Sequence, residues 1–385
     1  MDALGFGVFL APFHLAGQNP TLALQRDMEL ISRLDELGFD EAWIGEHHSA
    51  GAEIIAAPEI FIAAAAERTR RIRLGTGVIS LPYHHPFLVA DRMVLLDHLT
   101  RGRVMLGVGP GALPSDAAML GLAPERQRAM MEEALEAVVL LLTSDEPVTR
   151  HADWFTLRDA RLQLRPYQRP CFELAVAALI SPSGARAAGR FGAGLLSIGA
   201  TQSGGFDVLA NHWRIAEDRA AAHATSMDRR RWRLVAPMHL AETDEEARRE
   251  VAFGLPAWVD YFRNVAALRL APETDDSAEL VDTLNASGFA VIGTPDAAVA
   301  QIRRLLDQSG GFGTLVLMAH EWAQPDATLR SYELFARSVM PVFQGSAERA
   351  ARSRDWAAAN RDRFSAAAMG AVAKAVQDHY ADPDS

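Results

Sequence analysis

Short apolar segments and helical patterns alternate through the first third of the chain. The apolar segments have the length of strands and lie at residues 4–10, 39–44, 72–80 and 103–109. Between the first two, the apolar residues recur at the three- or four-residue spacing of one helix face: Leu24, Met28, Ile31 and Leu34. Helices between successive strands require right-handed crossovers and a parallel sheet. An open doubly wound sheet and a closed barrel both satisfy this alternation.

The later units are less regular, but predicted strands and helices continue to alternate. Further strands are predicted at residues 172–177, 194–198, 232–241 and 313–319. We expect an excursion at 148–168, and a long insertion at 264–288 that carries Asp275, Asp276 and Glu279. The total length favours a (β/α)8 TIM barrel with insertions. We therefore predict a barrel domain over residues 1–345 and a helical C-terminal extension over residues 346–385, with Asp244 as the N-cap of a helix that runs through Arg263.

Composition narrows the class of protein. The 385 residues are 49% hydrophobic, which suffices for a large core, and the formal net charge of -11 argues against a nucleic-acid partner or an anionic membrane. The single cysteine, Cys171, excludes an intramolecular disulfide and a cysteine-rich zinc site. We find no signal peptide and no apolar stretch of about 20 residues, the length that spans a bilayer. We expect a soluble cytoplasmic protein.

Titratable side chains follow the strand at residues 39–44. Glu46, His47 and His48 stand where barrel enzymes place their chemistry, at the C-terminal end of a strand. Histidine titrates near neutral pH and can donate or accept protons. Neighbouring residues of an extended chain point to opposite sides, so at most one of the two histidines faces a pocket. The alternative is that these residues only orient one another in a loop.

Other strand ends carry polar or aromatic residues on the same side of the predicted sheet. His84 and His85 follow the third strand, and His320, Glu321 and Trp322 follow the eighth. Glycines after the fourth strand allow a flat ligand to approach the backbone. Ser181 and Ser183 precede a helix, where they form either an anion site or an ordinary N-cap. No set of residues has the spacing of a metal site.

A series of motifs in order along the chain resembles the bacterial luciferase-like flavin-dependent monooxygenases. The resemblance covers roughly residues 4–340 and is closest to the limonene and diketocamphane monooxygenase branch. The motifs that carry it are Trp43-Ile44-Gly45-Glu46-His47-His48, Gly75-Thr76-Gly77-Val78-Ile79-Ser80-Leu81-Pro82, His85-Pro86, Gly102-Arg103, Gly107-Val108-Gly109, Gly293-Thr294-Pro295 and Gly310-Gly311-Phe312-Gly313-Thr314-Leu315, with Ala319-His320-Glu321-Trp322 typical of the branch.

The resemblance implies a (β/α)8 barrel that binds reduced FMN at the C-terminal ends of its strands, as a homodimer that receives flavin from a separate NAD(P)H:flavin reductase. It implies His47 as the catalytic residue, with Glu46 orienting or tuning it, and a non-proline cis peptide at Gly77-Val78 beneath the flavin. The implied cofactor-binding residues are Gly77, Val78, Ser80, Gly109, Ala177, Ser181 and Ser183, and the implied substrate pocket is formed by Phe9, Trp43, His85, His320 and Trp322.

The chain departs from the family pattern after the fourth strand. Pro110-Gly111 stands where luciferases have a phosphate-binding arginine, and Arg186 or Arg190 could substitute for it. Phe6, Phe13 and Ile79 are further candidates for an apolar wall that keeps the site dry.

The reaction implied by the resemblance starts when reduced FMN and O2 form a flavin C4a-hydroperoxide. One oxygen atom is then inserted into a small apolar substrate such as a terpene or a cyclic ketone, by epoxidation of an alkene or by conversion of a ketone to an ester. Two alternatives stay open: a deazaflavin (F420)-dependent dehydrogenase on the same barrel, and a non-catalytic flavin-binding paralogue suggested by Pro110.

Overall fold

Eight parallel strands close into a barrel in the computed structural model, which describes residues 3–202, 205–266, 274 and 276–381. Each strand pairs with the next, and the last pairs with the first, which leaves no open edge in the barrel. In order around the barrel, the strands are β1 (Gly5–Leu10), β2 (Glu41–Ile44), β3 (Arg73–Thr76), β5 (Val104–Gly109), β8 (Glu173–Ala178), β9 (Gly194–Ser197), β10 (Trp232–Leu240) and β12 (Thr314–Met318). The predicted TIM barrel is confirmed.

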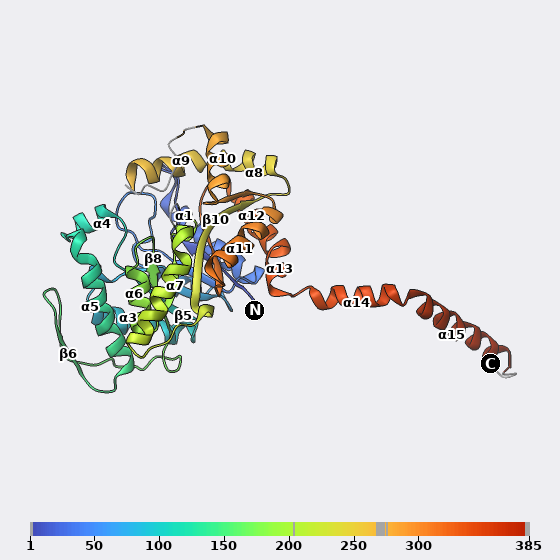
Figure 1. Cartoon of the computed structure of the whole chain (residues 1–385), viewed down its shortest axis with the longest axis horizontal. Helices are drawn as coiled ribbons and strands as arrows, with labels where there is room; N and C mark the ends of the chain where they lie inside the picture. The colour runs from blue at the N-terminus through green and yellow to red at the C-terminus, as the bar shows by residue number, and fades with distance from the viewer. Residues whose placement is uncertain (1–2, 203–204, 267–273, 275, 382–385) are drawn as a thin grey trace. The chain divides into compact units, whose positions relative to one another are not determined.

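Helices return the chain outside the barrel after each strand (Figure 1). They are α1 (Pro20–Leu37), α2 (Pro58–Ala66), α3 (Pro86–Thr100), α5 (Pro124–Thr143), α6 (Ser183–Phe191), α7 (Gly205–Ala222), α11 (Pro295–Ser309) and α12 (Pro325–Ser338). The boundaries of α1 illustrate the local causes: the Asn19 side chain accepts hydrogen bonds from two N–H groups of the first turn, and Gly38 ends the helix at φ 88°.

The largest additions to the eight strand–helix units are a hairpin and an insertion after β10. The predicted excursion is an antiparallel hairpin of β6 (Val148–His151) and β7 (Thr156–Ala160). The insertion after β10 contains α8 (Asp244–Val251), α9 (Leu255–Asp260), a π-helical turn (Tyr261–Val265), α10 (Ser277–Ser287) and β11 (Val291–Gly293), which pairs with β10. Shorter elements are α4 (Pro114–Met119), β4 (Ile79–Ser80), the 3-10 turns Leu81–Tyr83 and Arg229–Arg231, and α13 (Met340–Gln344).

The structure of the insertion differs from the sequence prediction at one helix and one strand. The helix predicted through Arg263 is interrupted between α8 and α9, and its N-cap is Thr243, whose side chain accepts a hydrogen bond from the Glu246 N–H. The strand β11 was not predicted, because its apolar run of three residues is too short to distinguish from the start of the next helix. The predicted acidic position Asp275 lies outside the described residues.

The chain divides into two compact units, residues 1–340 and 341–385. The second unit contains the helices α14 (Glu348–Ala359) and α15 (Arg361–Ala381), which match the predicted helical extension, and neither helix has a buried side chain. The predicted domain boundary after residue 345 stays a prediction, because compact units need not fold independently. No described helix is long and apolar enough to cross a membrane.

Candidate active site

Half-buried apolar side chains gather at the C-terminal end of the barrel, which we call the mouth. They form an apolar floor, to which the strands or the residues just after them contribute Ala11, Val78, Ala177, Ile198 and Met318. Fully buried side chains pack beneath this floor inside the barrel, among them Met105, Leu196 and Val235. The mouth therefore offers an apolar base for a ligand, and the interior below is dry.

Trp43 fills the interior of the barrel under the floor. Its exposure is 0%, and its indole Nε1 donates a hydrogen bond to Glu41. Three glycines make room for it: a Cβ on Gly75 would lie 2.6 Å from the Trp43 ring, one on Gly107 3.0 Å from it, and one on Gly77 2.9 Å from the Trp43 Cβ. The prediction that Trp43 lines the substrate pocket is corrected, because the side chain lies below the mouth and supports its floor.

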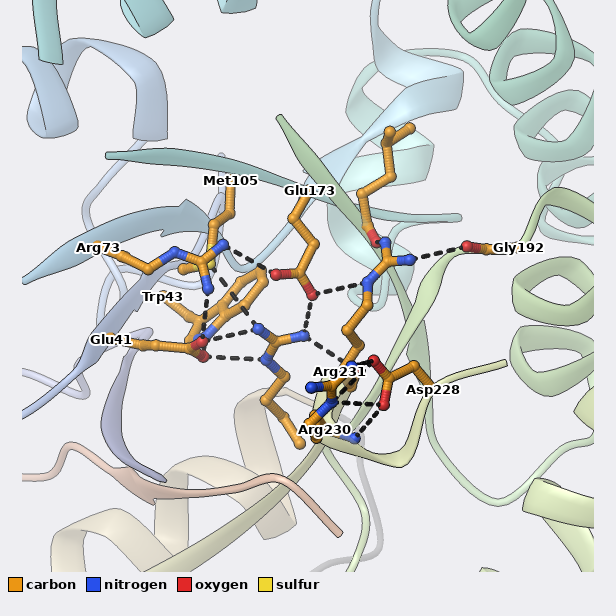
Figure 2. A network of polar contacts seen from close by, with 11 residues as sticks. Glu41, Trp43, Arg73, Met105, Glu173, Gly192, Asp228, Arg230 and Arg231 are labelled. Atoms are coloured by element: carbon orange, nitrogen blue, oxygen red, sulfur yellow. Dashed lines mark hydrogen bonds and ion pairs between the residues drawn. The ribbon is translucent and has the colours of Figure 1, made fainter. Parts of the chain in front are cut away.

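A charge network closes the barrel under Trp43 (Figure 2). Arg233, with 1% of its side chain exposed, binds Glu41 through two nitrogens at 2.9 and 2.7 Å and also binds Glu173. The Arg233 guanidinium lies 5.2 Å from the centre of a Trp43 ring, and Arg73 bridges the same two carboxylates. Burial alone would raise the pKa of Glu173, but the arginines hold it at about 2. This end of the barrel is therefore charged and paired, in contrast to the apolar mouth.

Four of the predicted cofactor-binding positions meet at the floor: Gly77, Val78, Gly109 and Ala177. The Gly77-Val78 peptide is cis, and the ring of Phe9, in the buried layer, packs against Gly77. A Cβ on Gly109 would lie 2.7 Å from Val78 Cγ2 and 3.7 Å from the Ala177 Cβ. The Val78 side chain therefore packs directly on the Gly109 backbone, and with Ala177 it forms an even apolar surface that suits a flat ring. Phe9, predicted as a pocket residue, is 5% exposed and belongs mainly to the layer below.

Glu46 is buried beside the mouth and accepts hydrogen bonds from three groups. These are the Ser80 N–H at 2.6 Å, His48 Nε2 at 3.0 Å and His84 Nε2 at 2.5 Å. Burial acts to raise the pKa of Glu46, but the hydrogen bonds of the two histidines lower it below its ordinary value. The prediction that Glu46 orients His47 is therefore wrong, because adjacent residues of the extended chain point apart. Ser80 is buried and takes part through its backbone N–H.

His47 lies between two carboxylates that the sequence reasoning did not identify. Its Nε2 lies 2.8 Å from Glu53, and its Nδ1 lies 3.4 Å from Asp116 on α4. Burial alone would lower the pKa of His47, but the Glu53 charge and the Asp116 hydrogen bond raise it to about 10. His47 is therefore an imidazolium at neutral pH. Asp116 is 1% exposed and also accepts from the His48 N–H at 3.1 Å, so it fixes the backbone directly after His47 as well as the His47 ring.

The start of α6 has no side-chain cap. Its N-cap position is Pro182, and the hydroxyls of Ser181 and Ser183 lie 2.8 Å from each other. The ordinary serine N-cap is therefore absent, and the first turn keeps N–H groups that favour an anion. Arg190, one of two predicted substitutes for the missing phosphate-binding arginine, is held by Glu132 and Glu136 on α5. Arg186 is exposed in the first turn of α6 and is the better candidate.

The predicted pocket residues outside the barrel strands separate into two groups. His85 is exposed, and its ring lies edge-on to Phe155 at 6.1 Å, so its prediction as a pocket residue is not supported. His320 and Trp322 are buried with their rings stacked at 4.0 Å, in the loop after β12. The predicted wall residue Phe6 is also misplaced, because it is fully buried against Phe335 of α12.

A second buried histidine fixes the loop after β12. His14 lies 3.1 Å from Glu321 and 3.1 Å from Asp27, and Arg26 binds the same Glu321 at 2.7 Å. Burial acts to lower the pKa of His14, but its two carboxylate partners raise it to about 9. This cluster anchors the loop that carries the buried Trp322. Across the described residues, we find no group of three or more histidine, cysteine or acidic side chains suited to a metal ion.

Comparisons with known proteins agree with the barrel fold. The luciferase-like monooxygenase family model matches residues 4–311. The chain is 52% identical to limonene 1,2-monooxygenase of Rhodococcus erythropolis, over 88% of the chain and 87% of that protein. It is 46% identical to 4-hydroxyprotoasukamycin monooxygenase of Streptomyces nodosus subsp. asukaensis, over 93% and 97%.

A solved structure is similar over the barrel. It is the oxygenating constituent of 3,6-diketocamphane monooxygenase from Pseudomonas putida, a type II Baeyer-Villiger monooxygenase in complex with FMN. It superimposes with a TM-score of 0.72 at 26% identity and covers 88% of this chain and 98% of that one. From the family match, the identities and the closed barrel, the chain belongs to the luciferase-like monooxygenase family of enzymes.

Proposed function

We propose that this enzyme is the oxygenase of a two-component system, which uses reduced FMN and O2 to insert one oxygen atom into a small apolar cyclic molecule such as a terpene or a cyclic ketone. The observation that carries the proposal is the apolar floor at the mouth, next to the His47 cluster, in a chain 52% identical to a limonene monooxygenase. Bound reduced FMN would supply the activation of O2, and the protein supplies position, dryness and charge.

The residues at the mouth fit FMN. Gly109 lets Val78 pack directly on its backbone beside Ala177, and this even apolar surface suits the face of a flat tricyclic ring. The uncapped start of α6, with Ser181 and Ser183, suits a phosphate group. An apolar floor over a dry interior keeps water from the ring, as oxygen chemistry on a reduced flavin requires.

His47 contributes a fixed positive charge in this proposal. Both of its ring nitrogens face carboxylates, so it holds its protons at neutral pH instead of exchanging them freely. Its positive charge offsets the charges of Glu53 and Asp116 beside the mouth, so that negative charge developing on a nearby oxygen atom meets less repulsion than from the two carboxylates alone. The His47→Ala variant is expected to keep FMN binding and lose product formation. Unchanged coupled turnover in this variant would contradict the role.

The proposed partners are O2, the organic substrate, a separate NAD(P)H:flavin reductase and a second copy of the chain, in the cytoplasm. The direct experiment measures oxygen uptake with FMN, NADH, a flavin reductase and a panel of terpenes and cyclic ketones. Products are identified by mass spectrometry with 18O2, and light scattering gives the oligomeric state. Incorporation of one 18O atom per product supports the proposal. Oxygen uptake that yields only hydrogen peroxide with every substrate refutes it.

A deazaflavin-dependent dehydrogenase on the same barrel is the rival that this experiment must separate. Equilibrium titrations of the protein with FMNH2 and with reduced deazaflavin, both without oxygen, compare the two cofactors directly. Tighter binding of the deazaflavin, together with hydride transfer in the absence of O2, would replace the monooxygenase proposal.

A further inference from the structure

The insertion after β10 forms a second hydrophobic core with the loops around the mouth. Its helices α9 and α10 and the π-helical turn pack with side chains from the loops after β1, β2, β5 and β12. Those loop side chains are Phe13, Ala52, Leu113 and Trp322. In Figure 1, α8, α9 and α10 lie together at one end of the barrel. Side chains of this insertion are therefore neighbours of the mouth.

Tyr261 starts the π-helical turn and carries a buried hydroxyl that the proposed chemistry does not use. The residue is 4% exposed, and its ring packs on Phe13 with centroids 5.3 Å apart. Its hydroxyl oxygen has no hydrogen-bond partner among the described residues. A π-helical turn costs helix stability and is frequent at functional sites. Here it places a polar group inside an otherwise apolar cluster.

The surroundings of this hydroxyl make it a hydrogen-bond donor. Burial first, and then the charges of Glu53 and Asp116, raise the pKa of Tyr261 above its ordinary value. The same two carboxylates hold His47, so the hydroxyl lies in the electrostatic field of the candidate active site. The indole Nε1 of Trp322 is a second buried donor without a partner in the described structure. Buried donors without partners are rare because each loses its hydrogen bond to water.

We propose that Tyr261 binds the substrate by donating a hydrogen bond from its hydroxyl to a substrate oxygen, so that the preferred substrates are cyclic molecules that already carry a carbonyl or hydroxyl group. This inference rests on the proposed function and narrows its substrate class. A hydrocarbon leaves the donor unpaired, whereas a ketone or an alcohol pairs it. Sites built around such a donor discriminate strongly against ligands that lack the acceptor.

The test uses two ligands that differ at one position. Carvone and limonene have the same ring skeleton, and carvone carries a ring carbonyl where limonene has a methylene group. Their affinities for the full-length protein are measured by isothermal titration calorimetry with oxidised FMN present and no reductant, so no turnover occurs. The wild-type protein is expected to bind carvone about tenfold more tightly than limonene. Tyr261→Phe is expected to lose that tenfold preference and to bind limonene unchanged.

Tyr332→Phe is the matched control, because Tyr332 is a buried tyrosine of α12 that packs on Phe39. It should keep the wild-type preference. Tyr261→Phe should unfold at the wild-type temperature or slightly above it, since it removes a hydroxyl without a protein partner. A clear loss of thermal stability would show that the hydroxyl has such a partner and would overturn the inference.

The outcomes separate this inference from the proposed function. A wild-type protein that binds carvone no better than limonene, or binds neither, overturns the inference, while oxygen insertion with reduced FMN can still occur. A carvone preference that Tyr261→Phe does not change overturns it as well. A preference that depends on Tyr261, in a protein that never inserts oxygen, supports the inference and overturns the proposed function.

Discussion

Replacing Arg233 by methionine tests whether the charge network under Trp43 stabilises the barrel. The variant removes the most buried partner of two carboxylates, Glu41 and Glu173, whose side chains are 5% and 12% exposed and which keep only the half-exposed Arg73 in common. Leaving buried charges unpaired costs about 3 to 5 kcal/mol. The pKa of Glu173, held at about 2 instead of 4.5 by Arg233 and Arg73 together, corresponds to about 3 kcal/mol for both arginines, from about 1.4 kcal/mol per pKa unit, and Arg233 is the larger contributor. We expect the free energy of unfolding to fall by about 3 kcal/mol.

Urea unfolding at pH 7, followed by tryptophan fluorescence, measures this change. Arg73→Ala is the control: it removes another arginine from the same two carboxylates, but its side chain is 36% exposed, and we expect a loss of about 1 kcal/mol or less. The pH dependence has a definite sign. Because the pKa of Glu173 is lowered in the folded state, its contribution is present above pH 4.5 and is lost as the pH falls through about 2.

The stability gap between wild type and Arg233→Met should therefore shrink over that acidic range. A loss below 1 kcal/mol at pH 7, or a gap independent of pH, would refute the reasoning that the network is held together by paired buried charge. Equal losses for Arg73→Ala and Arg233→Met would show that burial of Arg233 does not distinguish the two.

Three further predictions concern the mouth and the barrel interior below it. Glu53→Gln is expected to lower the pKa of His47 from about 10 by at least one unit, measured by NMR titration of the imidazole; an unchanged pKa would leave Glu53 without influence. Gly107→Ala would place a Cβ 2.1 Å from a carbonyl oxygen of β3, and thermal unfolding should show a loss of about 2 kcal/mol or more, where an unchanged midpoint would contradict the packing. Alanine at both Ser181 and Ser183 should weaken FMN about tenfold in equilibrium titrations and leave riboflavin unchanged, whereas equal weakening of both ligands would exclude a phosphate site.

The sequence predicted the barrel because its signal is repeated along the chain. Apolar runs of strand length, separated by helical spacing and by residues such as Gly38, define eight units without any knowledge of contacts. Among the missed elements, β11 and α4 are short and lack a period of their own, whereas α10 and α12 are longer helices that were not separated from the insertion and the chain after the eighth strand. Local caps were predicted less well: Thr243 and Asp244 are both good capping residues, and only the backbone conformation decides between them.

The candidate site was predicted only in part, for a different reason. The strand ends identified His47 and Gly77 because motifs mark those positions. Glu53 follows β2 in a loop and Asp116 lies on the short helix α4, and both reach His47 through the fold without a motif that marks them. Tyr261 comes from the insertion and faces the same two carboxylates, so no local spacing marks it either.

The indole of Trp43 inside the barrel limits the size of the side chains that fit at distant positions of the chain. Trp43 occupies space that any side chain at Gly75 or Gly107 would need. A relative with a smaller residue at position 43 can therefore carry alanine or serine at 75 or 107, and one that keeps tryptophan cannot. These three positions should drift together as lineages diverge, and a graft of this barrel's mouth onto another member of the family must transplant all three at once.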